Sequence, residues 1–391
     1  MISLTLALAL ASPVPDGLAS PVPRVQEGPL DHVRSLATAG PTSDAIRAAE
    51  RAVHDRALAG EAWELLGGLY EARGETARAE GAYRQALRRG WGTYRGYLAL
   101  AGGALQRAAP ELARSLAQEA LRERPDDGPA NVLMGEILST LGERAQAWAF
   151  YERGLWAGHD PTATHGAMAW LASETGRWTA MTHHLRQAAR LGTPDRRVYG
   201  ALSEILLDDG AHAEAAALLT QAIARFPGDP LFHYRLGRSL MGSGHPGAAE
   251  EHLRRAAPDP VLRAQVQAAL GEIALGAGDL EGAAGYFRQA VVSAPATFHL
   301  LVQAGRASLA LGASAEAETY FTRALGLRPG DPETAFALGE LRLEAGTPDL
   351  ARAYFKIALA APDLRPRANL RLQEIARIAQ GSGSGPVRLR L

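Results

Sequence analysis

The sequence repeats itself every 34 residues, nine times in succession and without a gap. The units occupy residues 60–93, 94–127, 128–161, 162–195, 196–229, 230–263, 264–297, 298–331 and 332–365. Three places of the unit hold small residues. The eighth reads Gly67, Ala101, Gly135, Ala169, Ser203, Gly237, Gly271, Gly305 and Gly339. The twentieth is alanine in every unit except the fourth, which has Met181, and the twenty-seventh is always alanine or glycine.

Small residues at fixed places have a direct physical cause. Two helices whose axes approach closely leave almost no room between them, and a larger group there costs about 1–3 kcal/mol. Large residues fill other places, and burying each contributes about 1.5–3 kcal/mol. At the twenty-fourth place they are Tyr83, Tyr151, Leu185, Leu219, Leu253, Phe287, Phe321 and Phe355. The pattern predicts a tightly packed helix pair in each unit.

The ends of the helices are also visible in the sequence. The fifteenth place is glycine in eight units and Ala108 in the other, which predicts that the chain leaves the first helix through a left-handed residue. Between units, an aspartate followed by a proline predicts a capping carboxylate and the first turn of the next helix. These pairs begin at Asp160, Asp229, Asp259 and Asp331.

The repeat closely resembles that of the tetratricopeptide repeat (TPR) family, a helix-turn-helix of 34 residues. The first unit carries the family's residues Trp63, Leu66, Gly67, Tyr70, Ala79, Tyr83 and Ala86. The chain departs from the family at the fourth place, where polar residues replace the aromatic in several units. They are Asn131, His165, His233 and Gln267. The resemblance implies an all-α, right-handed α-solenoid of tandem repeats.

Charge, cysteine content and the first eleven residues limit which partners and which cellular compartments fit this chain. With 41 basic and 42 acidic residues the net charge is -1, so no bulk electrostatic attraction to nucleic acid is expected. Without cysteine, disulfides and thiolate chemistry are excluded. Residues 1–11 are apolar and end in a small-x-small sequence, typical of a short signal peptide. The protein is then periplasmic or secreted, and otherwise cytoplasmic. Eleven residues are too few for a membrane span, which needs about 20.

The segments outside the repeats are expected to be simple. Residues 12–41 are rich in Pro, Gly, Ser and Ala and are interpreted as a linker. Residues 42–59 are expected to form a capping helix with Ser43 as its N-cap, equivalent to half a repeat. Residues 366–380 are predicted to form a second capping helix that covers the last repeat. Residues 381–391 are interpreted as a flexible tail.

Motifs for catalysis and cofactors are largely missing. Residues 242–247 match GxGxxG, but no strand precedes them, so we expect a turn rather than a dinucleotide site. The sequence has no HExxH pair and no GxSxG elbow. His183 and His184 point about 100° apart on a helix, which disfavours a shared metal ion. We therefore expect no cofactor, no metal and no catalytic residue.

The resemblance also implies a partner surface. In the TPR family the first helices line a concave groove, with the second, fifth, ninth and twelfth places pointing inward. Carried onto this chain, the proposed partner-binding residues are Glu136, Trp170, Arg197, Glu204, Tyr234, Arg238, Glu272, His299, Arg306, Phe336 and Glu340. Aromatic residues and arginine often dominate binding energy. The favoured function is a non-catalytic scaffold or adaptor that binds an extended peptide or helix, within a bacterial multiprotein assembly.

Two alternatives remain open. Trp148, Trp156, Trp170 and Trp178 gather around the fourth repeat, where Met181 breaks the alanine rule. A local pocket there would suit a regulatory receptor whose superhelix changes when a short peptide or small molecule binds. An enzyme with a site around His165, His183 and Trp170 is the third reading. The sequence does not identify the partner, the pathway or the oligomeric state.

Overall fold

The computed structural model describes residues 28–379, and all regular structure in that range is helical. The chain divides into two units, residues 1–167 and 168–391. In the first lie α1 (Pro29–Thr38), α2 (Ser43–Ala52), α3 (Ala59–Ala72), α4 (Thr76–Arg88), α5 (Tyr94–Gln106), α6 (Pro110–Glu123), α7 (Gly128–Thr140) and α8 (Arg144–Trp156). The boundary between the units falls within α9 (Pro161–Glu174).

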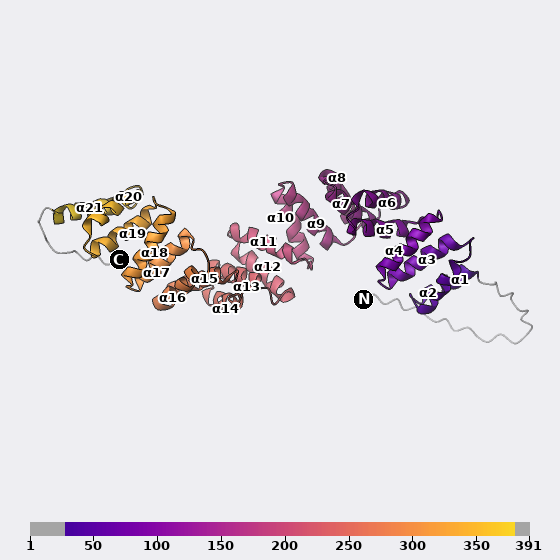
Figure 1. Cartoon of the computed structure of the whole chain (residues 1–391), viewed down its shortest axis with the longest axis horizontal. Coiled ribbons are helices and arrows are strands. Elements are labelled where there is room, and N and C mark those ends of the chain that lie inside the picture. The colour runs from indigo at the N-terminus through magenta and orange to yellow at the C-terminus, as the bar shows by residue number, and fades with distance from the viewer. Residues whose placement is uncertain (1–27, 380–391) are drawn as a thin grey trace, which may run out of the picture. The chain divides into compact units, whose positions relative to one another are not determined.

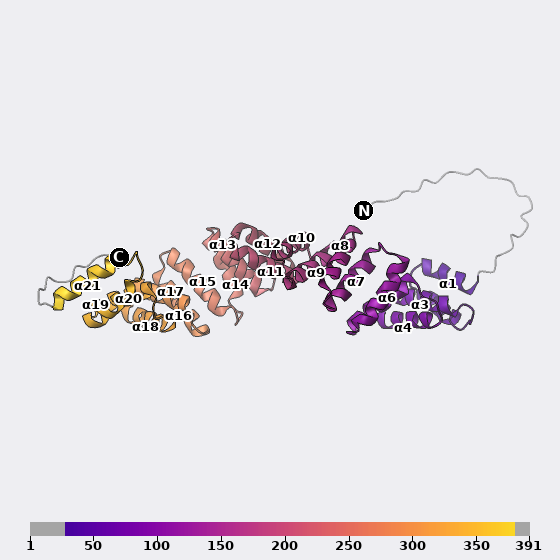
Figure 2. The ribbon, with the colours of Figure 1, turned by 90° about the horizontal axis from the view of Figure 1, so that it is seen from above.

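The second unit continues with the remaining helices. They are α10 (Trp178–Arg190), α11 (Arg196–Asp208), α12 (His212–Arg225), α13 (Pro230–Gly242), α14 (Pro246–Ala256), α15 (Arg263–Gly276), α16 (Leu280–Ser293), α17 (Phe298–Ala310), α18 (Ser314–Leu327), α19 (Pro332–Glu344), α20 (Pro348–Ala358) and α21 (Arg365–Ala379). From α1 to α8 and from α10 to α21, each helix packs against its neighbours in the sequence (Figures 1 and 2). The expected all-α solenoid of helix-turn-helix repeats is thus confirmed.

The eighth and twenty-fourth places of a unit meet face to face, which explains the small residue. A methyl group on Gly305 would lie 2.6 Å from Cε1 of Phe321, and one on Gly67 would lie 2.7 Å from Cδ1 of Tyr83. Both distances are shorter than a real carbon–carbon contact. The rings that occupy this place are fully buried. The predicted close approach of the two helices is therefore confirmed.

The turns within the units follow the prediction. Gly74 and its seven counterparts at the fifteenth place all have positive φ, and so does Ala108 at 56°. Asp229 and Asp331 cap α13 and α19 through the backbone N–H groups of Leu231 and Thr334. Asp259 does not cap the first turn of a helix at the place predicted. Its carboxylate accepts hydrogen bonds from the backbone N–H groups of Val261 and Leu262 in a short turn. As a result α15 begins only at Arg263.

The amino-terminal expectations need two corrections. Helix α1 lies inside the segment interpreted as a linker, and it buries Leu30 and Val33 against α2 and α3. Their three-residue spacing forms an apolar stripe that the surrounding Pro, Gly and Ala obscured. Helix α2 therefore belongs to a full helix pair and is not a lone capping helix. Its N-cap is Thr42, whose hydroxyl accepts from the N–H of Ala45, so Ser43 is already inside the helix.

The predicted carboxyl-terminal capping helix is present as α21. It buries Ala368 and Ile375 in a cluster with Phe355 of α20. The expected signal peptide, most of the expected linker and the expected tail lie outside the described residues.

Polar residues at the fourth place hold the loop that precedes their helix. The amide of Asn131 donates to the carbonyl oxygens of Pro125 at 2.9 Å and Asp127 at 2.7 Å. His233 Nε2 contacts the carbonyl oxygen of Pro227 at 3.2 Å, six residues earlier as in the asparagine case. Since a carbonyl only accepts, Nε2 carries a proton. These buried side chains replace the packing of an aromatic ring with hydrogen bonds.

The close approach within each pair predicts a sharp contrast between two glycines of one repeat. Gly305→Ala forces a methyl group against Phe321, so we expect a loss of about 1–3 kcal/mol in the free energy of unfolding. Gly326→Ala lies in α18 with open space around its Cβ, so we expect a gain of about 0.5–1 kcal/mol. Urea denaturation followed by circular dichroism measures both. Equal effects of the two substitutions would contradict the packing argument.

The His233–His252 pair predicts a loss of stability in mild acid. The two rings stack with Nδ1 atoms 3.1 Å apart. Burial, and then the neighbouring His233, lower the pKa of His252 below its ordinary value. The neutral form is therefore favoured in the folded state. Its contribution is full above the unfolded pKa of about 6.5 and is lost as the pH falls through the folded pKa.

We therefore expect the urea midpoint to fall between pH 7.5 and pH 5. His252→Gln keeps a donor for His233 and removes the titration, so the midpoint should depend less on pH over this range. An unchanged pH dependence in this variant would show that other groups cause the effect.

Candidate partner-binding surface

The first helices of successive repeats lie closer together than the second helices do. In the first unit α3 contacts α5 and α5 contacts α7, and in the second unit α11 contacts α13 and α13 contacts α15. Stacked pairs whose first helices converge must diverge at their second helices. Within each unit the first helices therefore form the inner face.

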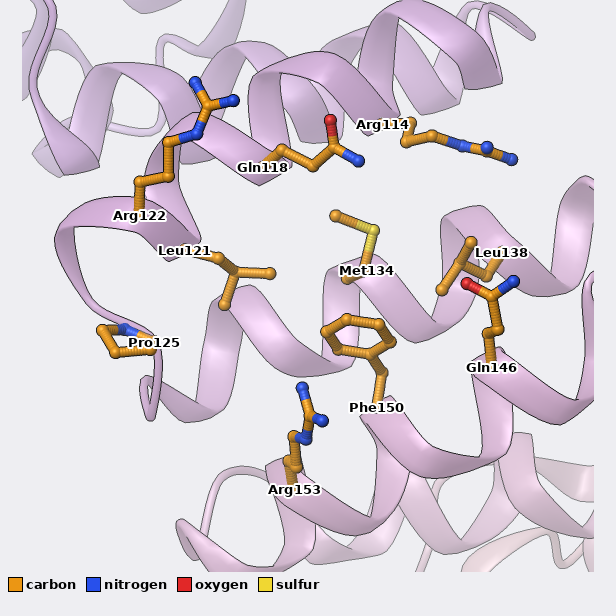
Figure 3. A pocket seen from close by; sticks show the side chains of 10 residues that line it. All are labelled: Arg114, Gln118, Leu121, Arg122, Pro125, Met134, Leu138, Gln146, Phe150 and Arg153. Carbon is orange, nitrogen blue, oxygen red and sulfur yellow. The ribbon is translucent and has the colours of Figure 1, made fainter.

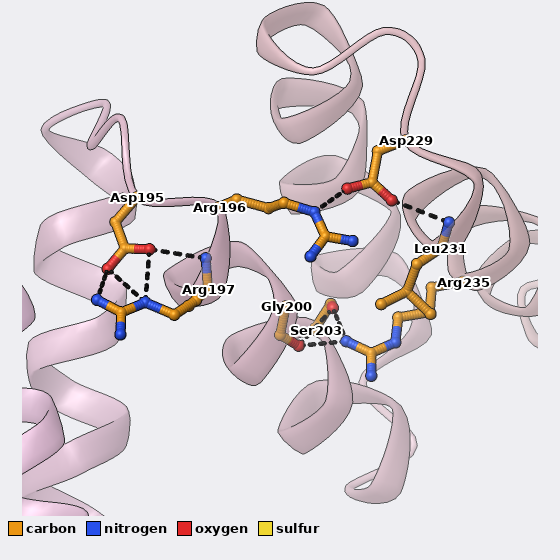
Figure 4. Close-up of polar contacts among 8 residues, drawn as sticks. All are labelled: Asp195, Arg196, Arg197, Gly200, Ser203, Asp229, Leu231 and Arg235. Carbon is orange, nitrogen blue, oxygen red and sulfur yellow. Dashed lines mark hydrogen bonds and ion pairs between the residues drawn. The ribbon is translucent and has the colours of Figure 1, made fainter.

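One polar cluster on this face joins Trp170, Asp195 and Arg197. The guanidinium of Arg197 lies over the Trp170 ring, 5.3 Å from its centroid. It also donates to both carboxylate oxygens of Asp195, at 2.8 Å from Nη2 and 3.1 Å from Nε (Figure 4). This hydrogen bond lowers the pKa of Asp195. The Arg197 side chain is nevertheless 72% exposed, so its outer edge is open to a ligand.

The neighbouring Arg196 points the other way along the chain. It forms an ion pair with Asp229, the cap of α13, and its guanidinium lies 5.5 Å from the Phe232 ring centroid. Burial is the largest single influence and raises the pKa of Asp229, but the hydrogen bond and the charge of Arg196, together with the backbone N–H groups of Leu231 and Phe232, hold that pKa below its ordinary value. Figure 4 shows the two arginines extending to separate carboxylates. Arg196 thus ties α11 to the start of α13.

Arg235 of α13 joins the same two helices and was missed by the sequence analysis. It donates to the carbonyl oxygen of Gly200 and to Ser203 Oγ at 3.0 Å (Figure 4). It also donates to Glu204 at 2.9 Å. Its side chain is only 15% exposed. A signal was available, because Arg235 is the only charged residue at the sixth place of any repeat.

The remaining residues proposed on α13 and on later helices differ in exposure and in the contacts that they make with other side chains. Arg238 is exposed and donates to the Tyr234 hydroxyl oxygen at 3.2 Å. Arg306 forms an ion pair with Glu333 of the next repeat at 2.7 Å. Glu272 is half-buried and His299 is exposed.

Glu136 lies in the first unit, on α7. Its side chain reaches solvent, yet the protein atoms around it raise the pKa of its carboxyl. A carboxyl group that reaches solvent but is poorly hydrated, as here, is expected on a concave part of the surface.

Two residues proposed as partner contacts are covered by the chain itself. Phe336 is only 8% exposed, packs on Phe355 and lies beneath the guanidinium of Arg367 from α21. Glu340 accepts two hydrogen bonds from Arg371 of the same helix, at 2.8 and 2.6 Å. Helix α21 thus occupies the inner face of the last repeat. The proposal that these residues meet a partner is corrected accordingly.

For Met181, the sequence left a local pocket open as the less favoured alternative to repacking of the core. Met181 is partly buried and packs against the cluster that contains Leu185 and Leu202. Its extra volume is therefore taken up by the core of the second unit. Trp178, on the same helix, is 66% exposed.

Residues 28–379 contain neither a metal site nor a membrane-spanning helix. No group of three or more histidine or acidic side chains there is arranged to hold a metal ion. No helix in that part of the chain has the length and apolar character needed to cross a membrane.

Family models describe most of the chain. Models of the tetratricopeptide repeat match residues 30–92, 167–230 and 302–368, and a second such model matches residues 206–273. The chain belongs to the tetratricopeptide repeat family. The first match includes α1 and α2, which agrees with their being a full helix pair. TPR arrays are generally non-catalytic and use extended surfaces to bind other proteins.

Several solved structures are similar to this chain at low sequence identity. YrrB, described as a TPR protein with an unusual peptide-binding site, is 17% identical over 49% of this chain and 96% of its own, with a TM-score of 0.40. A MamA structure is 18% identical over 44% and 94%, with a TM-score of 0.38. The Cut9-Hcn1 complex is 16% identical over 88% and 81%, with a TM-score of 0.43. No curated protein matches this chain.

The arrangement of Arg235 predicts a specific effect on stability. Arg235→Ala leaves the carbonyl of Gly200 and the hydroxyl of Ser203 without their shared donor, so we expect a loss of about 1–3 kcal/mol in the free energy of unfolding. Arg238→Ala, three residues further on and exposed, should change it by less than about 0.5 kcal/mol. Chemical denaturation of both variants tests this. A similar, small effect at both positions would exclude a structural role for Arg235.

Proposed function

We propose that this TPR protein is a non-catalytic scaffold that binds an extended segment of a partner protein along the inner face of its first helices, within a bacterial multiprotein assembly. The contact is centred on the second unit, on α9, α11 and α13. Its residues are Trp170, Arg197, Glu204, Tyr234 and Arg238.

The observation that carries the proposal is the fixed arrangement of charge and aromatic surface on these helices. Arg235 and Arg196 tie α11 to α13, so the exposed side chains between them are carried by a stiff backbone. Asp195 and the Trp170 ring hold Arg197 in place. A surface organised before binding loses less conformational entropy when a ligand arrives.

The charges indicate which partner segment fits. Arg238 donates to a neutral phenol, so its charge is not balanced by that contact. It is therefore the strongest candidate to receive a partner carboxylate, in a charge-assisted hydrogen bond. Trp170 and Tyr234 offer aromatic surface on either side of Glu204. We infer a segment with an acidic residue opposite Arg238 and apolar residues beside it.

The other inner-face residues, Glu136, Glu272, His299 and Arg306, extend the proposed surface and await a test of their own. Arg306 would have to exchange Glu333 for a partner carboxylate.

The proposal predicts that charge reversal on this face abolishes partner binding without unfolding. Arg197→Glu combined with Arg238→Glu should remove the partner recovered by crosslinking in cells and affinity purification of the full chain. Both side chains are exposed, so helix content and melting should change little.

The matched control is Arg190→Glu combined with Arg323→Glu, on the second helices α10 and α18 and also exposed. It makes the same change in net charge and should retain the partner. Retention by the first variant, or equal loss by both, would rule out the inner face as the binding surface.

A further inference from the structure

A cleft on the opposite side of the first unit is a second candidate site. It lies between α6 and α8, has α7 as its floor and encloses about 480 Å³. Figure 3 shows Arg122 and Gln118 on one wall and Phe150 and Arg153 on the other. Its floor residues Met134 and Leu138 stand two positions before and after Glu136 on α7. A helix turns 100° per residue, so they point about 160° away from that inner-face residue.

The shape of the stack explains why a cleft opens here. The first helices of consecutive repeats converge, so the second helices α6 and α8 diverge, and buried side chains of α7 lie at the bottom of the space between them. The floor is apolar, with Met134 2% exposed and Leu138 3% exposed. Leu121 and Phe150 form half-buried apolar walls above it (Figure 3). An apolar cavity of this volume is within the range of about 300–1,000 Å³ found for ligand sites.

The charged residues of the cleft are all cationic. Arg114, Arg122 and Arg153 line it, and no carboxylate is among its lining residues. Arg122 pairs with Glu119, which lies outside the lining, and Arg114 pairs with Glu143. The Arg114 Nε atom is buried and makes no hydrogen bond in the described part of the chain, but it lies 3.6 Å from a carboxylate oxygen of Glu111.

Arg153 differs from the other two arginines. Its guanidinium stacks on the Phe150 ring, 4.9 Å from the centroid, and its charge is not balanced by that contact. An anion in the cleft could therefore bind Arg153 without displacing a carboxylate. Arg122 lies on the facing wall.

We propose that this cleft binds an acidic peptide segment of a partner, with one apolar side chain inserted toward Met134 and with flanking carboxylates on Arg122 and Arg153. The charge complementarity selects the acidic residues. The exposed amides of Gln118 and Gln146 on facing walls suit a peptide, because they donate to and accept from its backbone. An ionised fatty acid has no donor for their carbonyl oxygens. The proposal does not depend on the function of the inner face.

The test selects decapeptides from a phage-displayed random library on the immobilised full chain. We expect enriched peptides to carry an apolar residue flanked by Asp or Glu. The most enriched peptide, labelled with fluorescein, is then titrated with purified variants and followed by fluorescence anisotropy. Gln118→Trp fills the mouth of the cleft, and Arg122→Gln with Arg153→Gln removes the charge. Each variant should raise the dissociation constant of the peptide at least about tenfold.

Two controls separate the cleft from the inner face and from misfolding. The inner-face variant Arg197→Glu with Arg238→Glu should bind the peptide as the unaltered chain does. All substituted side chains are exposed, and circular dichroism melting checks that each variant is folded.

Three results would overturn the proposal. The first is a selection without acidic, apolar peptides. The second is a peptide whose binding is unchanged by Gln118→Trp but lost in the inner-face variant. The third is Arg153-dependent binding of decanoate by a chain that binds no selected peptide, which would assign the cleft to a small amphipathic anion.

Discussion

The structure depends on the contact between a glycine in the first helix of a repeat and a large side chain in the second. Where Gly305 faces Phe321, no atom can be added without displacing the ring. The same contact recurs at Gly67, Gly135, Gly271 and Gly339. Because packed interiors tolerate neither extra volume nor voids, this contact sets the separation of the two helices in each pair. The position of every exposed side chain on the pair follows from that separation.

The stacking of the pairs then creates two unlike faces. First helices converge, so side chains from successive repeats such as Arg235 and Glu204 meet and pair. Second helices diverge, and in the first unit arginines line the gap between α6 and α8 above a buried apolar floor. The two proposed binding surfaces thus have one geometric cause but different chemistry. The inner face in the second unit mixes both charges, whereas the lining of the cleft in the first unit is only cationic.

Much of the fold could be predicted because each place of the repeat occurs nine times, so a preference for small or large residues can be recognised even where one copy departs from it. Nine copies at one register identify the helix pairs, the turn glycines and the buried twenty-fourth place. Where the register stops, the prediction failed. Helix α1 was interpreted as linker because its stripe of Leu30 and Val33 is short and lies among residues typical of loops. The candidate site was predicted less well, since Phe336 occupies an inner-face place but is covered by α21.

The sequence by itself determined the all-helical class and the period of the repeat, because these follow from side-chain volume at fixed intervals along the chain. The family followed from the resemblance of that repeat to the TPR unit. Only the tertiary structure decided which inner-face groups are already engaged. Whether Glu340 faces solvent or Arg371, and whether Arg235 reaches Gly200, depends on how helices more than 30 residues apart are brought together. The cleft beside Phe150 is likewise a property of the space between helices, and no local pattern of residues encodes that space.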